Sequence, residues 1–121
     1  MINSILASAT KGQPEPVVGM GATFLHYSDR FPGTVTEVFK IGKATAIRVA
    51  GDSFRVLRGS IQDGSAEYGI SPDWDATGGV WKFDGKRWVS VRKNPKTGRW
   101  KKTYSGNLRI GSRDVYYDPH F

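Results

Sequence analysis

Positively charged and aromatic side chains alternate along one stretch of the chain, residues 82–102, and this mixture suits contact with a polyanion. The stretch holds nine Lys or Arg residues and one acid, Asp84, so its net charge is +8. Because the whole chain of 121 residues has a net charge of +7, the excess of cations lies here. Five rings lie in or beside it: Trp81, Phe83, Trp88, Trp100 and Tyr104. Cations hold phosphates and flat rings stack on bases, so the pattern predicts a nucleic-acid-binding surface.

The predicted interface uses three rings for stacking and six cations for phosphate contact. These residues are Trp88, Trp100 and Tyr104, together with Lys82, Lys86, Arg92, Lys93, Lys101 and Lys102. Stacking on such rings contributes about 1–3 kcal/mol for each base, with little preference for base identity. The expected partner is therefore DNA or RNA bound with low sequence specificity.

Two hairpins must display these side chains, and a one-residue change of register moves every side chain to the opposite face. In the first hairpin, a three-residue loop over 83–85 would place Trp88 on the charged face. A two-residue turn at 84–85 would instead pair Trp81 with Trp88 and leave both faces partly apolar. We prefer the first register because it separates the valines from the charges.

The second hairpin is expected to turn over 94–98, which closes Lys93 against Arg99. With that register, all three predicted stacking rings share one face with the cations. Burial is the competing outcome, because tryptophan is more often buried than displayed and this chain is poor in Leu and Ile. The exposed basic row would then consist of Arg87, Lys93, Arg99 and Lys101.

The elements that position these side chains are predicted to be β strands. Gly, Pro, Asn and Asp recur at short intervals between runs rich in Val, Thr and aromatic residues. The predicted strands are 22–27, 34–40, 44–50, 53–58, 79–83, 87–93, 99–104 and 107–110. Three of them, between residues 34 and 58, are expected to form an antiparallel meander with turns at 41–44 and 50–53. The fold class is therefore all-β.

The chain is expected to form a single domain over residues 19–121. Residues 1–18 look like a flexible or short-helical lead-in, because Pro14 and Pro16 end any helix that begins before them. Residues 60–78 hold four acids and no Lys or Arg, and we interpret them as a long acidic loop. Tyr68 and Trp74 are expected to pin this loop to the body of the domain.

Signals for catalysis, metals and membranes are weak. The chain has no cysteine, and its carboxylates match no calcium loop, so we expect no catalytic residue, no metal site and no cofactor. His26 and Asp29 have the types of an acid–base pair, but a turn cap is the preferred interpretation. No apolar run is long enough for a membrane span, and no small-molecule substrate is indicated. An intracellular, non-enzymatic protein is expected.

Three segments resemble a family of small, mostly uncharacterised bacteriophage proteins, over about residues 17–58 and 107–121. They are Val18-Gly19-Met20-Gly21-Ala22-Thr23, then Ser28-Asp29-Arg30-Phe31-Pro32-Gly33-Thr34-Val35-Thr36-Glu37-Val38, and Ile110-Gly111-Ser112-Arg113-Asp114-Val115-Tyr116-Tyr117-Asp118-Pro119-His120-Phe121. The resemblance implies a tailed-phage or prophage origin and a place of action in the host bacterial cytoplasm. It implies no functional residues.

The middle segment is also similar to the first hairpin of small SH3-like barrels. That likeness implies a small, strongly bent antiparallel barrel with the C-terminal tail tucked over one end. Two further functions remain open beside nucleic-acid binding. One is a protein that inhibits or modulates a host defence or transcription enzyme by docking on an acidic surface of it. The other is a minor component of the phage particle.

Overall fold

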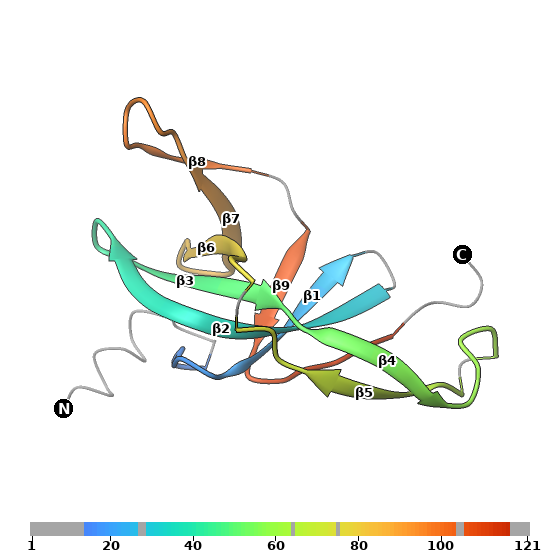
Figure 1. Ribbon diagram of the computed structural model, residues 1–121. Helices are drawn as coiled ribbons and strands as arrows, with labels where there is room; N and C mark the ends of the chain where they lie inside the picture. The colour runs from blue at the N-terminus through green and yellow to red at the C-terminus, as the bar shows by residue number, and fades with distance from the viewer. Residues whose placement is uncertain (1–13, 27–28, 64, 75, 104–105, 117–121) are drawn as a thin grey trace.

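Runs of β-branched and aromatic residues form strands throughout the part of the chain that the computed structural model describes, which is residues 14–26, 29–63, 65–74, 76–103 and 106–116. One antiparallel sheet has the order β8-β7-β6-β3-β2-β1-β9 (Figure 1). Its strands are β1 (Gly21–His26), β2 (Asp29–Ile41), β3 (Ala44–Gly51), β6 (Gly79–Phe83), β7 (Trp88–Lys93), β8 (Trp100–Lys102) and β9 (Asn107–Ile110). A separate ribbon pairs β4 (Ser53–Arg58) with β5 (Glu67–Ser71). The prediction of an all-β fold is confirmed.

The centre of the sheet is the long hairpin of β2 and β3. Ile41 pairs with Ala44 across a two-residue turn, in which Gly42 takes a positive φ of 61°. A bulge between Val35 and Glu37 bends β2, so its first half pairs with β1 while its second half continues along β3. This bend starts the curl of the whole sheet. The predicted turn at 41–44 is confirmed.

The sheet curls until β7 contacts β9, although β9 is the last strand at the far edge. No strand pairing among the described residues joins the edge strands β8 and β9, so the sheet is curled without being a closed barrel there. Described residues include no helix that is long and apolar enough to cross a membrane.

Both faces of the curled sheet bury apolar side chains. The inner face carries the larger cluster, which includes Ile47, Val49, Trp81, Phe83 and Trp88, with β1 and β9 adding Ala22, Leu108 and Ile110. The outer face carries a smaller cluster of Ala46, Val80 and Val91, covered by Phe39, Ile41 and Trp100. A chain this poor in Leu and Ile therefore fills its core largely with Val, Ala and aromatic residues. Each aromatic ring buries a large area.

The predicted three-strand meander is wrong in its last strand. Residues 50–53 do not turn the chain back on β3; β6 takes that edge of β3 instead, and β4 leaves the sheet. Its partner β5 lies inside the segment that we predicted to be an acidic loop. The rings of Phe54 and Tyr68 meet edge to face at 5.9 Å and hold the ribbon together. Tyr68 therefore anchors this segment, whereas Trp74 is 57% exposed.

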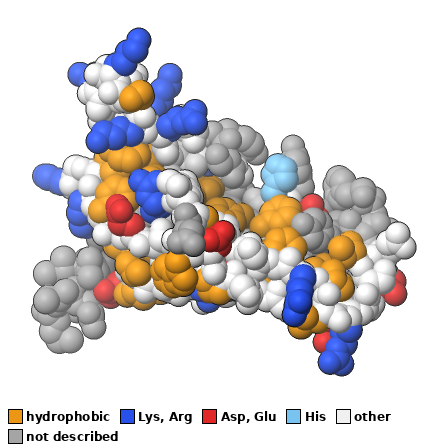
Figure 2. All heavy atoms as spheres, in the orientation of Figure 1, with side chains coloured by type: hydrophobic (Ala, Val, Ile, Leu, Met, Phe, Trp, Pro, Cys, Tyr) orange, Lys and Arg blue, Asp and Glu red, His pale blue; other side chains and the backbone are white. Residues whose placement is uncertain are grey.

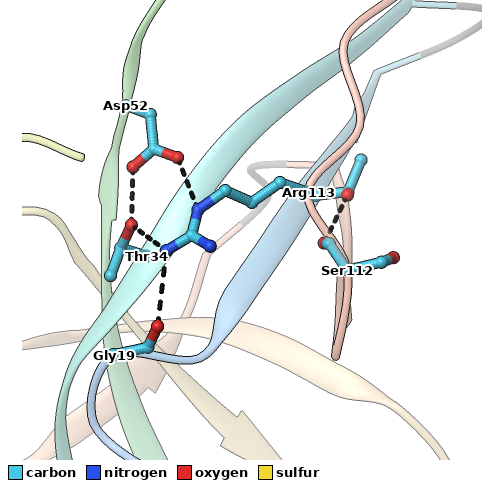
Figure 3. Close-up of polar contacts among 6 residues, drawn as sticks. Gly19, Thr34, Asp52, Ser112 and Arg113 are labelled. Carbon is cyan, nitrogen blue, oxygen red and sulfur yellow. Dashed lines mark hydrogen bonds and ion pairs between the residues drawn. The ribbon is translucent and has the colours of Figure 1, made fainter. Parts of the chain in front are cut away.

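The segment after β9 is held by side-chain contacts at the open end of the β2–β3 hairpin, opposite its turn (Figure 3). The Arg113 guanidinium donates to the carboxylate of Asp52, to the Thr34 hydroxyl and to the carbonyl of Gly19. Thr34 in turn donates to the other Asp52 oxygen at 2.7 Å. Gly19, Thr34 and Arg113, one residue from each of the three resembling segments, take part in this network.

Candidate nucleic-acid interface

The cations of the 82–102 stretch extend from the body of the protein on the β7–β8 hairpin and the adjoining β6–β7 turn. Eight of the nine side chains are exposed, and only Lys82 is half-buried. Figure 2 shows Lys and Arg atoms gathered around this projection. None of the nine forms an ion pair with another described residue, whereas the cations that do are Arg30, Arg58, Arg109 and Arg113. The hairpin therefore presents exposed positive charge that no ion pair of the described residues neutralises.

The one acid of this stretch is used by the turn that contains it. The carboxylate of Asp84 accepts hydrogen bonds from the backbone N–H groups of Arg87 and Lys86, both at 2.9 Å. These bonds, the one from Arg87 first, hold the pKa of Asp84 below its ordinary value of 3.8. Asp84 therefore remains ionised at neutral pH while it fixes the turn.

Trp88 is not a stacking platform, and its predicted exposure is wrong. The side chain is 1% exposed and lies in the inner-face cluster, with its ring 5.3 Å from that of Phe83. Phe83 pairs with Trp88 across a four-residue loop, so neither the three-residue nor the two-residue turn is correct. The indole Nε1–H of Trp88 has no hydrogen-bond acceptor among the described residues. Stacking by Trp88 is therefore excluded.

Trp100 lies on the outer face and is half-buried. It pairs with Lys93 rather than with Arg92, because the second hairpin closes over six residues and not over the predicted five. Its ring packs 6.1 Å from that of Phe39, and the Lys93 ammonium lies 5.9 Å from the ring centroid. Trp100 thus anchors the hairpin on the outer-face cluster. Tyr104 lies outside the described residues.

The two corrected registers divide the predicted cations between both faces. Lys82, Lys93 and Lys102 share the outer face with Trp100, while Arg92 and Lys101 face each other on the opposite side. Lys86 lies at the tip of the β6–β7 turn. A single face of rings and cations is therefore not formed. The hairpin is charged on both sides, with one half-buried ring at its base.

A groove opens at the base of this hairpin, where β6 begins and β7 ends. Its volume is about 760 Å³, and its lining includes Arg48, Gly79, Trp81, Arg92, Lys93 and Trp100. Among the residues that the structure describes, none that lines the groove is acidic. Of these six, only Arg92, Lys93 and Trp100 belong to the predicted interface. The available signal for the rest was the pair Gly78-Gly79 two residues before Trp81, since glycine in a strand often marks a close approach of a ligand or another backbone.

The Arg113 network is a polar cluster away from the hairpin, and its hydrogen bonds join the segment after β9 to β2 and to the residue after β3. The Asp52 carboxylate is fully buried and is paired by both Thr34 and Arg113. His26 and Asp29 face each other as a register pair at the β1–β2 connection. Among the described residues, no three side chains of His, Cys, Asp or Glu are grouped to hold a metal ion.

Comparison with protein-family models, with curated proteins and with solved structures finds no match for this chain. The resemblance to phage proteins therefore stays a prediction, and functional inference depends on the charge and shape of the hairpin and groove.

Proposed function

We propose that this protein is a non-enzymatic module that binds nucleic acid with low sequence specificity through the β7–β8 hairpin. The observation that carries the proposal is the set of eight exposed cations on the hairpin and the adjoining turn, none paired with a carboxylate of the described residues. A two-stranded ribbon charged on both faces fits a phosphate backbone, and release of counterions from the backbone drives such binding. Phosphate contacts then replace the row of stacked rings as the main source of affinity.

The cations that we assign to phosphate contact are Lys82, Lys86, Arg92, Lys93, Lys101 and Lys102. Phage origin and action in the bacterial cytoplasm are part of the proposal and follow from the sequence resemblance alone. An SH3-like barrel is also kept as a proposal for the curled sheet, supported by the contact of β7 with β9.

The test compares two triple variants that have equal net charge. The first removes Lys93, Lys101 and Lys102 from the hairpin as alanines, and the second removes Lys43, Arg55 and Arg58 from other exposed strands and turns. Binding of labelled single-stranded and duplex DNA is measured by fluorescence anisotropy at about 50 mM salt, where phosphate contacts are strong. We expect the hairpin variant to bind at least about tenfold more weakly than the control variant.

Equal affinities of the two triple variants would contradict the assignment to the hairpin. No binding of wild-type protein to either DNA or RNA would contradict the function. An acidic surface of a host protein would then be the partner to test.

A further inference from the structure

We propose that the groove at the base of the β7–β8 hairpin takes one unpaired nucleotide, and that the protein therefore prefers single-stranded to duplex nucleic acid. This inference rests on the proposed function and names the form of nucleic acid that the site selects. It assigns a role to residues on β3 and β6 that the hairpin charges alone leave unused.

The groove has the size for one nucleotide and is continuous with the hairpin, so it fits a nucleotide of a nucleic-acid strand that is bound to the hairpin. Its volume of about 760 Å³ lies within the range of roughly 300–1,000 Å³ that is usual for ligand sites. Arg92 and Lys93 belong both to the groove lining and to the hairpin. A nucleic-acid strand whose phosphates contact the hairpin cations therefore passes the mouth of the groove.

The charge of the groove fits an anionic ligand. Three cations line it, Arg48 from β3 and Arg92 and Lys93 from β7, and none of the described residues that line it is an acid. Arg48 donates through Nη1 to the carbonyl of Gly78 at 3.3 Å, which leaves the other guanidinium N–H groups free of any described partner. A guanidinium held in this way by the carbonyl just before β6 is suited to a phosphate at the rim.

The absence of a side chain at Gly79 provides the space for a base. A Cβ at this position would meet only Trp81 Nε1, at 4.0 Å. The rings of Phe24, Trp81 and Trp100 also line the groove. The neighbouring Gly78 differs, because a Cβ there would lie 2.3 Å from the carbonyl oxygen of Val49. Gly78 is thus required for packing, whereas Gly79 leaves open a space beside the Trp81 indole.

Base pairing determines which nucleic acids can use this space. In a duplex both faces of each base are covered by its neighbours, so entry into a pocket requires unstacking and unpairing. In a single strand the base is already available to contact aromatic side chains. The groove therefore adds affinity for single strands that a duplex of equal phosphate spacing does not gain.

The decisive variant is Gly79→Leu, which fills the groove and retains every cation. Because its Cβ has room, the variant is expected to fold, and thermal unfolding checks this. Ser71→Leu, at the exposed last position of β5, is the control for adding a leucine to a strand. The probes are a thymidine strand of about twelve nucleotides, an abasic strand with the same number of phosphates, and a duplex of the same length.

Wild type and Ser71→Leu are expected to bind the thymidine strand about tenfold more tightly than the abasic strand. In Gly79→Leu this ratio should fall to about one, while affinity for the abasic strand and the duplex is unchanged. Equal binding of the two strands by wild type, or a full preference kept by Gly79→Leu, overturns the groove assignment and leaves the proposed function standing. Failure to bind any of the three probes overturns the proposed function and the groove assignment together.

Discussion

Arg113 donates through Nε to the Oδ2 atom of Asp52 at 3.0 Å, joining residues 61 positions apart in the chain. The Asp52 side chain is fully buried, whereas that of Arg113 is 29% exposed. A second Asp52 oxygen accepts from Thr34, so the carboxylate is paired on both sides. This ion pair is the centre of the network that joins the segment after β9 to the open end of the β2–β3 hairpin (Figure 3).

Arg113→Ala is expected to destabilise the protein because it leaves the buried Asp52 charge without its cation. Breaking a buried pair costs about 3–5 kcal/mol, and the partial exposure of Arg113 lowers our expectation to about 2–3 kcal/mol. Chemical denaturation measures the free energy of unfolding. The control is Arg109→Ala, whose exposed side chain lies 3.8 Å from Asp114 and should cost less than about 1 kcal/mol. Equal losses in the two variants would contradict the structural role of this network.

Trp88→Phe is expected to be tolerated because it removes a buried N–H group that lacks an acceptor among the described residues. An unpaired buried donor costs about 1–3 kcal/mol, which offsets the loss of ring volume. We expect Trp88→Phe to change the free energy of unfolding by less than about 1.5 kcal/mol, and Trp88→Ala to lower it by about 3–5 kcal/mol.

Trp74→Phe serves as the matched exposed control, with no measurable change expected. If Trp88→Phe is as damaging as Trp88→Ala, the indole nitrogen has a partner that the described contacts do not include.

Asp84 gives the β6–β7 turn a dependence on pH. Backbone hydrogen bonds from Arg87 and Lys86 hold its pKa below 3.8 in the folded protein. A carboxyl group with a lowered folded pKa stabilises the fold above its unfolded pKa, and this contribution is lost as the pH falls through the folded pKa. Asp84→Asn keeps an acceptor oxygen but cannot titrate.

The variant should therefore lose less stability than wild type when the pH falls from about 6 to about 3. Unfolding at both values measures the difference, and NMR titration of the Asp84 carboxyl gives its folded pKa directly. An Asp84 pKa at its ordinary value would contradict the hydrogen bonds that the turn makes to this carboxylate.

Much of the fold could be predicted from the sequence because local signals determine strands and turns. Gly42 marks the tight turn of the central hairpin, and alternation of valine with polar residues indicates the strands around it. Pairing partners were harder to predict. The edge of β3 that β4 was predicted to take is occupied by β6, through a pairing between residues more than 25 positions apart that no local pattern contains.

The candidate site depended on hairpin registers, which short sequence patterns determine poorly. Asp84 and Asn94 both accept hydrogen bonds from backbone N–H groups two and three residues later, and these bonds lengthen the loops beyond the predicted turns. The first loop places Trp88 opposite Phe83 on the inner face, and the second places Trp100 opposite Lys93 on the outer face. Composition therefore located the cationic stretch, whereas the face of the sheet on which each ring lies was determined only by the structure.

The salt dependence of binding to a single strand tests the central claim most directly. If the hairpin cations neutralise phosphates, a plot of log affinity against log salt concentration falls with a slope of about −0.7 for each phosphate contact. We predict a slope steeper than about −2 for wild type, which the triple variant lacking Lys93, Lys101 and Lys102 reduces by about 2. A flat plot for wild-type protein, or an unchanged slope in that variant, would contradict the account.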